Sequence, residues 1–281
     1  MMRTPITYYG GKQQLAKIIL SMIPSHKIYC EPYLGGGAVF FAKGKSYCEV
    51  INDIDNRIIK FYEVCQDVVL FRQLIERIEH TLDSEAMFIR AGKIWYNPST
   101  ARSSVDIAWA VWLTCNLGYG GSPEGGWKWD NGTSGSHSGV VMDNYRHQFT
   151  QKIHERLKHV QISCRDALKV IEQRDSEDTF FFLDPPYPGC VQKHYSGFTN
   201  NDLEELLQLL TTIKGKFLLC NFSSQLLNRY VKQNGWNTEV KNMALRVANR
   251  ITNGRKCKQE VMVYNYQIQP QLFNEEVPEE L

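Results

Sequence analysis

Four consecutive residues in the second half of the chain combine groups that suit an exocyclic amine. They follow the apolar run Thr179–Leu183 directly, and they are Asp184, Pro185, Pro186 and Tyr187. An aromatic-rich run of this length predicts a buried strand that proline ends, and each proline removes one backbone N–H donor. A carboxylate, a free carbonyl and an aromatic face would then lie together at the edge of a sheet. Two acceptors suit the two N–H bonds of an amine, and the ring suits stacking on the base that carries it.

A strand followed by a proline turn is the simpler interpretation, because this tetrapeptide would recur by chance in roughly one chain in several hundred. Two other segments support a site. Cys30–Phe40 has the pattern of a strand, a glycine turn and a helix start, and Val50–Asp55 has that of a second strand ending in acid. Glycines such as Gly35 and Gly37 let a backbone approach a ligand, and an acid such as Asp53 can accept both hydroxyls of a ribose. The loop lacks the third glycine of a dinucleotide loop, so a tight turn alone is also compatible with it.

Taken in order, these motifs resemble those of the Dam-like, alpha-group DNA adenine N6-methyltransferases. That family has an opening Tyr/Trp-x-Gly-Gly-Lys, then Glu-Pro-Phe/Tyr-x-Gly-x-Gly, then an acid before isoleucine, and last Asp-Pro-Pro-Tyr. Here the matching segments are Tyr8–Lys12, Glu31–Gly37, Asp53 and Asp184–Tyr187. The resemblance covers roughly residues 5–62 and 157–267, and it is weak between them.

The fold that the resemblance implies is α/β. We expect a Rossmann-like S-adenosylmethionine-dependent methyltransferase sheet with an inserted, mainly helical target-recognition domain. The catalytic domain would be discontinuous, formed by residues 1–62 and 157–281, and the insertion would span residues 63–156.

The implied cofactor is S-adenosylmethionine. Tyr8 and Lys12 stand at the family's positions around the methionine moiety. The loop of Gly35 and Gly37 would pass close to the cofactor, and Asp53 would bind its ribose.

Four further acids belong to this predicted site. Asp55 is the alternative to Asp53 for the ribose. Asp166 stands where the family accepts a hydrogen bond from the cofactor's adenine amine, although it is equally placed to cap the helix that follows. Glu31 would support the cofactor pocket, and Asp184 would border it.

The implied reaction transfers a methyl group to N6 of an adenine flipped out of duplex DNA. Asp184 and the carbonyl of Pro185 would accept hydrogen bonds from the amine, Pro186 would keep the turn rigid, and Tyr187 would stack on the base. Because the methyl group is already activated, aiming the amine is the main task, and positioning alone can contribute roughly 7–11 kcal/mol.

The predicted DNA-binding residues fall in two places. A C-terminal hairpin would present basic side chains to phosphates, although such a run is also typical of a solvated face. These side chains are Arg250, Arg255, Lys256 and Lys258. In the middle of the chain, Arg146 and an aromatic loop within Gly118–Gly139 would read or wedge the groove, although core packing also explains its tryptophans. The loop carries Tyr119, Trp127, Trp129 and the hairpin signal Asn131-Gly132.

Periodicity predicts the elements that position these residues. Helices are expected over Gln13–Met22, Asn56–Arg77, Ser84–Ile94, Val105–Leu117, Arg165–Gln173, Asn201–Ile213 and Gln225–Lys232. Further strands are expected over His159–Ser163, Lys216–Asn221 and Glu260–Tyr266. The acidic end, Asn274–Leu281, lacks packing residues.

Composition sets limits on other classes. The chain has 281 residues, a net charge of +2 and eight cysteines, none in a Cys-x-x-Cys pair, so neither a zinc site nor a disulfide framework is indicated. No apolar stretch is long enough to span a membrane. We expect a cytoplasmic, DNA-associated protein of bacterial or phage type, with no metal, acting as a monomer or as a dimer on DNA.

Two alternatives remain open at this stage. An RNA adenine N6-methyltransferase would share the Asp-Pro-Pro-Tyr motif. A catalytically inactive, nucleic-acid-binding relative would keep the fold and lose turnover, which the presence of Asp184, Asp53 and Lys12 disfavours.

Overall fold

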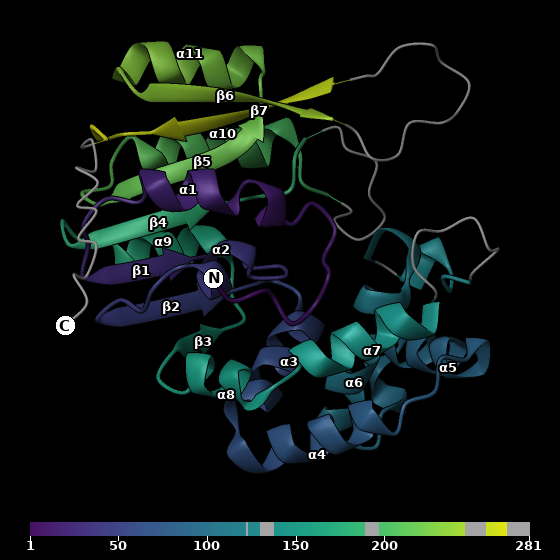
Figure 1. The fold of residues 1–281 in the computed structure, drawn as a ribbon. Helices are drawn as coiled ribbons and strands as arrows, with labels where there is room; N and C mark the ends of the chain where they lie inside the picture. Colours follow the sequence, from purple (N-terminus) through teal and green to yellow (C-terminus); the bar gives the residue numbers. More distant parts are fainter. Residues whose placement is uncertain (122, 130–137, 189–196, 245–256, 269–281) are drawn as a thin grey trace, which may run out of the picture.

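A computed structural model describes residues 1–121, 123–129, 138–188, 197–244 and 257–268. They form a seven-stranded sheet in the order β3-β2-β1-β4-β5-β7-β6 (Figure 1). The strands are β1 Ile28–Glu31, β2 Cys48–Asn52, β3 Gln161–Ser163, β4 Thr179–Leu183, β5 Lys216–Phe222, β6 Asn237–Ala244 and β7 Cys257–Tyr264. Strands β1 to β5 are parallel, and β7 is antiparallel to both β5 and β6. The parallel part runs 3-2-1-4-5, as in a doubly wound sheet, so the predicted Rossmann-like α/β class is confirmed.

Helices cover both faces of the sheet, because the central strands carry apolar side chains on both faces. Phe180 and Phe182 of β4 belong to the core that includes residues of α1, α2 and α3, whereas Phe181 and Leu183 face α9, α10 and α11. The helices of the sheet layers are α1 Ala16–Met22, α2 Ala38–Ala42, α3 Asn56–Gln66, α9 Ala167–Arg174, α10 Asn200–Leu210 and α11 Gln225–Asn234.

Between β2 and β3 the described residues form mainly helices, which gather beside the sheet in Figure 1. After α3 these are α4 Val68–Glu79, α5 Glu85–Tyr96, α6 Ser104–Leu117, α7 Ser138–Gln148 and α8 Gln151–Leu157. Helix α6 is apolar on all sides, and its Trp109 and Trp112 are buried among the other helices. The proposed insertion limits, residues 63 and 156, fall inside α3 and α8.

The single helix predicted over Asn56–Arg77 is wrong, because the structure breaks it into α3 and α4 at Asp67. Asp67 has extended backbone angles, and its side chain accepts hydrogen bonds from the backbone N–H groups of Val69 and Leu70. This N-cap starts a new helix and lets α4 take a different direction.

Three described elements were not predicted. Helix α7 begins at Ser138, inside the stretch assigned to the Gly118–Gly139 loop, and α8 follows it. Strand β6 pairs with β7 along its whole length, so β7 starts at Cys257 rather than at Glu260. The Asn131-Gly132 hairpin signal lies outside the described residues.

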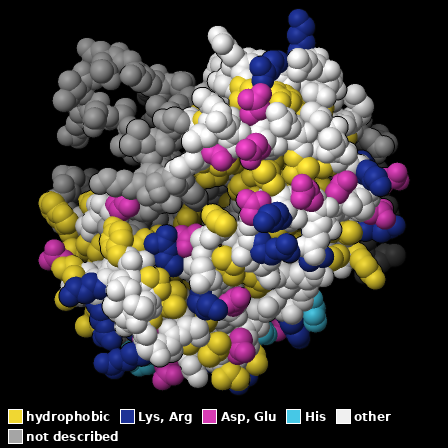
Figure 2. All heavy atoms as spheres, turned by 180° about the vertical axis from the view of Figure 1, so that it is seen from behind, with side chains coloured by type: hydrophobic (Ala, Val, Ile, Leu, Met, Phe, Trp, Pro, Cys, Tyr) yellow, Lys and Arg dark blue, Asp and Glu magenta, His cyan; other side chains and the backbone are white. Residues whose placement is uncertain are grey.

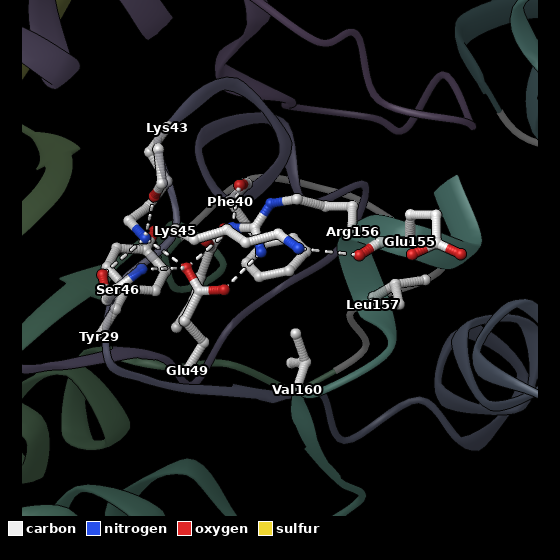
Figure 3. A network of polar contacts seen from close by, with 12 residues as sticks. Tyr29, Phe40, Lys43, Lys45, Ser46, Glu49, Glu155, Arg156, Leu157 and Val160 are labelled. Carbon is white, nitrogen blue, oxygen red and sulfur yellow. Dashed lines mark hydrogen bonds and ion pairs between the residues drawn. The ribbon is translucent and has the colours of Figure 1, made fainter. Parts of the chain in front are cut away.

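A buried ionic network ties the end of the helical part to the sheet (Figure 3). The guanidinium of Arg156 in α8 donates to both carboxylate oxygens of Glu49 in β2 and to the carbonyl of Phe40 in α2. The ammonium of Lys43, which follows α2, donates to the same carboxylate. Burial disfavours the charge of Glu49, but the hydrogen bonds from Arg156 and Lys43 outweigh it and lower its pKa.

The N-terminal segment, residues 4–12, runs between the helical part and the glycine loop. The Thr7 backbone N–H donates to Asn116 Oδ1 of α6 at 2.9 Å, and the Thr7 hydroxyl lies 3.3 Å from that of Tyr145 in α7. At its start, the Thr4 hydroxyl donates to the Gly36 carbonyl. The segment therefore contacts both parts of the molecule before it reaches Lys12.

Candidate active site

Three predicted residues meet at the carboxyl end of β4. The ammonium of Lys12 lies 2.6 Å from Asp184 Oδ1, and the Tyr187 hydroxyl donates to the same oxygen at 3.2 Å. Lys12 Nζ also lies 5.0 Å from the centroid of the Tyr187 ring. Pro185 is buried and Pro186 is half-buried beside them. The structure thus brings the opening and the closing motif of the sequence into contact.

A fourth residue, Glu260 of β7, completes this cluster. Its Oε1 accepts from the Tyr187 hydroxyl and lies 3.3 Å from Lys12 Nζ. Its exposed fraction is 6%. We call Lys12, Asp184, Tyr187 and Glu260 the acid cluster. Glu260 was not among the predicted site residues, although the sequence from Asn249 to Val263 resembles the family's C-terminal hairpin, whose last strand has a Glu-Val/Leu-Leu/Met-Val ending.

Burial and charge act in opposite directions within the acid cluster. Burial alone would lower the pKa of Lys12, but the negative charge around it, that of Asp184 foremost, raises this pKa above its ordinary value. For Asp184, burial is the largest influence and raises its pKa, Glu260 adds to this rise, and Lys12 opposes it. The ammonium of Lys12 therefore stays charged at neutral pH.

Glu31, at the end of β1, lies beside this cluster and is 2% exposed. The Tyr29 hydroxyl donates to its Oε2 at 2.6 Å. Burial raises the pKa of Glu31 to about 8, and the charge of Asp184 adds to that rise. A carboxyl group with this pKa is mostly protonated at pH 7 and supplies a hydrogen-bond donor.

The glycine loop between β1 and α2 has the predicted conformation. Gly35 and Gly37 have φ of 48° and 66°, which favours glycine. A Cβ at Gly35 would lie 2.9 Å from the ring of Tyr8, so the ring packs directly on the loop. Asp53, after β2, accepts from the Gly35 backbone N–H at 2.8 Å and from that of Asp55 at 2.9 Å. Burial raises the pKa of Asp53 to about 6.

Asp55 and Asp166, the other two acids, both act as helix caps. The side chain of Asp55 accepts from the Arg57 backbone N–H and pairs with its guanidinium, with one contact at 2.6 Å. This pairing favours Asp53 over Asp55 as the acid available to a ligand. The exposed Asp166 accepts from the backbone N–H of Lys169 at 3.1 Å, which leaves its second oxygen without a contact among the described residues.

An unsatisfied donor lies on the strand next to Asp184. Asn221, near the carboxyl end of β5, is 2% exposed, and its Nδ2 has no hydrogen-bond partner within the described part of the chain. A buried donor without an acceptor costs about 1–3 kcal/mol. An acceptor atom of a ligand at this edge would satisfy it. Asn221 was not among the predicted site residues, because an asparagine in an apolar strand gives no spacing signal.

The predicted DNA-binding residues are not brought together. The Arg146 guanidinium donates to Asp143 Oδ1 at 2.6 Å and to the Thr81 carbonyl, so contact with DNA would require replacing these bonds. Trp127 is half-buried and donates to Asp83 Oδ1 at 3.2 Å. Tyr119 and Trp129 are exposed.

The predicted basic turn is described only at its end. Arg250, Arg255 and Lys256 lie outside the described residues, and Lys258 belongs to β7. Figure 2 shows the face opposite to that of Figure 1, where basic and acidic side chains of the described residues are interspersed. Among the side chains of the described residues, that face shows no continuous basic area.

Metal and membrane features are absent from the described residues. No group of three or more His, Cys, Asp or Glu side chains is placed there to bind a metal ion. None of the described helices combines the length and apolarity needed to cross a bilayer. A cavity of ≈ 680 Å³ lies on the helical part, between α5 and Trp127, and contains no residue of the acid cluster.

Comparison with known proteins matches residues 8–245 to a family described as D12 class N6 adenine-specific DNA methyltransferase. Among curated proteins, the Type II methyltransferase M.MjaIII of Methanocaldococcus jannaschii is 26% identical over 223 residues, which is 71% of this chain and 74% of that protein. Two solved structures resemble the chain distantly. Precorrin 8w decarboxylase of Methanobacterium thermoautotrophicum has a TM-score of 0.41 at 9% identity and covers 95% of this chain and 100% of its own. Precorrin-6y C5,15-methyltransferase of Geobacter metallireducens has a TM-score of 0.37 at 9% identity, covering 89% and 86%.

Proposed function

Because this chain belongs to the family of D12 class N6 adenine-specific DNA methyltransferases, we propose that its acid cluster is where the methyl group reaches the adenine. The enzyme methylates DNA adenine at N6. The further proposals are its cofactor, the role of each residue and the flipping of the target base. The observation that carries them is the contact of Lys12 and Tyr187 with Asp184 at the carboxyl end of β4.

The residues present fit S-adenosylmethionine as the cofactor. The loop of Gly35 and Gly37 can approach a ligand closely, and Asp53 keeps acceptor capacity for ribose hydroxyls beside its two backbone contacts. The unsatisfied Nδ2 of Asn221 offers a donor at the same edge. Counting Lys12 against Asp184 and Glu260, the acid cluster has one more carboxylate than ammonium groups, which suits a cationic ligand.

When bound, S-adenosylmethionine supplies a methyl group activated on a positively charged sulfur. Asp184 and the Pro185 carbonyl accept hydrogen bonds from the adenine amine, which turns the nitrogen lone pair away from the ring. The negative charge of Asp184 stabilises the positive charge that develops on N6 during transfer. Lys12 and Tyr187 both contact Oδ1 of Asp184, which leaves Oδ2 to face the amine.

Tyr187 binds the flipped base by stacking. Its hydroxyl is engaged by Asp184 and Glu260, and its ring meets the edge of Phe222 with centroids 4.3 Å apart at 72°. These contacts fix the ring plane before the base arrives. Flipping a base from a duplex costs a few kcal/mol, and stacking on a fixed ring offsets part of that cost.

We propose that residues 63–156, which carry most of the helices between β2 and β3, form the target-recognition insertion. Tyr119 and Trp129, exposed on this part, are the residues best placed to reach a groove. The phosphate contacts are proposed for Arg250, Arg255, Lys256 and Lys258, with Arg146 as a further candidate in the insertion.

The test is the substitution Asp184→Ala, followed by sequencing of modified bases in DNA from cells that express the variant. We expect the loss of detectable N6-methyladenine and an intact fold, because the carboxylate lies at a sheet edge. The matched control is Asp178→Ala, an exposed acid on the turn before β4 that pairs with Lys27. Methylation by the Asp184→Ala variant within a few-fold of the wild type would contradict the proposal.

The same experiment addresses the substrate. Wild-type enzyme that marks RNA and leaves DNA unmodified would move the assignment to an RNA methyltransferase. The modified motif itself comes from the sequencing, since base readout depends on side chains of the insertion.

A further inference from the structure

Two donors of the acid cluster bridge the same two carboxylate oxygens. Lys12 Nζ contacts Asp184 Oδ1 at 2.6 Å and Glu260 Oε1 at 3.3 Å. The Tyr187 hydroxyl contacts the same pair of atoms. The four side chains therefore form a closed ring of contacts, in which Glu260 comes from the C-terminal hairpin and has no predicted role in the site.

Glu260 reaches the cluster from a separate element. It lies on β7, opposite Phe222 of β5 in the antiparallel register, and its side chain is 8% exposed. A buried carboxylate is costly unless it is paired. Glu260 pairs here with Lys12 and Tyr187, the two residues that contact Asp184. Its position therefore affects the geometry of the site more than that of the β6–β7 hairpin.

Resting on the proposed function, we infer that Glu260 is a positioning residue for methyl transfer. It binds Lys12 and Tyr187 together, so that Asp184 presents Oδ2 to the adenine amine, and it keeps the cluster negative overall. Without its charge, the ammonium of Lys12 would neutralise Asp184. The positive charge that develops on N6 would then meet a neutral environment instead of a negative one.

The surroundings of Asp184 make this role measurable by pH. The groups that face it are Lys12 of the N-terminal segment, its neighbour Tyr187, Glu260 of β7, Cys220 of β5 and Glu31 of β1. The charge of Glu260 raises the pKa of Asp184. Removing that charge lowers the pH at which Asp184 becomes protonated and inactive.

The experiment measures single-turnover methylation of a duplex against pH for E260Q, E260D and the control E239Q. We expect E260Q to react roughly 10- to 100-fold more slowly at neutral pH. The acid limb of its pH–rate profile, where the rate falls as Asp184 becomes protonated, should move to lower pH. E260D keeps the charge but shortens the reach, so its rate should fall while its acid limb stays. Glu239, on the neighbouring strand β6, is 43% exposed and pairs only with Lys241 among the described residues, so E239Q should match the wild type.

A wild-type rate and an unshifted acid limb in E260Q overturn the inference. A slower rate without a shift of the acid limb also overturns it, because a loosened hairpin would produce that result. Thermal melting checks that each variant is folded. If E260Q does not fold, a wild-type rate in E260D overturns the inference. D184A, assayed in parallel, separates the two claims: an active D184A refutes the proposed function, whereas an inactive D184A beside an unaffected E260Q refutes only the role of Glu260.

Discussion

Three acids around the site have pKa values that burial raises, and their partners differ. Glu31 receives a hydrogen bond from a tyrosine, and burial raises its pKa to about 8, which makes it a donor at neutral pH. Asp53 accepts two backbone N–H groups and has a pKa of about 6. Asp184 has an ammonium at 2.6 Å that opposes the effect of burial. In the proposed function, three carboxyl groups thus supply a donor, a ribose acceptor and an amine acceptor, according to environment.

The first prediction follows from Asp53. Burial raises its pKa to about 6, so the carboxyl group is protonated below that pH and must lose a proton before it can accept two ribose hydroxyls. We expect the affinity for S-adenosylmethionine to fall by up to about tenfold for each pH unit below the pKa. Calorimetry of the full-length protein at several values between about pH 5 and about pH 8 measures this.

The control is Asp53→Asn, which has no proton to lose. This variant should bind the cofactor weakly at all of these pH values and show no break near the pKa of Asp53. A wild-type affinity that is the same at both ends of the range would assign the ribose to another residue, with Asp55 next.

At the scale of elements, the network of Arg156, Glu49 and Lys43 joins α8 to β2 and to the segment after α2. Substituting Arg156 with Met should lower the free energy of unfolding by about 3 kcal/mol, because it leaves a buried carboxylate with one cation instead of two. Chemical denaturation monitored by circular dichroism gives this difference.

The comparison variant is Lys158→Met, just after the end of the same helix, where an exposed lysine lies 3.9 Å from Glu155. Exposed pairs contribute at most about 1 kcal/mol. Equal losses in the two variants would show that the network around Glu49 is not buried in solution.

The sequence predicted the elements whose signal is local. The run Thr179–Leu183 matches β4, and the glycine turn and the end of β2 lie where their motifs predict them. Lys12 and Asp184 of the acid cluster meet at the carboxyl end of β4. Strand β6 was missed because its residues are polar in alternation with few apolar ones, and only pairing with β7 stabilises it. The break at Asp67 was missed because the apolar pattern continues through it.

The site was predicted less completely, for a related reason. The strand ending that contains Glu260 resembles the family's, but its contact with Lys12 joins residues far apart in the chain, and no pattern within the strand of Asn221 marks that residue. Like those of the DNA-binding residues, the roles of all the predicted site residues stay predictions: Tyr8, Lys12, Glu31, Gly35, Gly37, Asp53, Asp166, Asp184, Pro185, Pro186 and Tyr187.

At the scale of the whole molecule, the third prediction separates affinity from specificity. Neutralising Arg255, Lys256 and Lys258 together should weaken binding to cognate and unrelated duplexes alike and leave the methylated motif unchanged, because phosphate contacts do not read sequence. For every phosphate that the variant no longer binds, the slope of log affinity against log salt should become shallower by about 0.9. Binding titrations over a range of salt concentrations measure the slope.

A matched control neutralises Lys27, Lys214 and Lys216, which lie at the amino ends of β1 and β5, away from Asp184. It changes the net charge equally. If the first triple variant keeps the wild-type salt slope, the basic turn faces solvent; if both variants change it equally, the effect comes from net charge alone.

The N-terminal segment has a consequence for how the enzyme is made. Lys12 leaves the ribosome early, but its partners Asp184 and Glu260 follow after most of the chain has been synthesised. Contacts this distant in sequence form late, after the local helices. A nascent chain that has completed β4 still lacks Glu260, so the site can close only when β7 is released. Under the proposed role of the acid cluster, chains cut short before residue 260 should not methylate DNA.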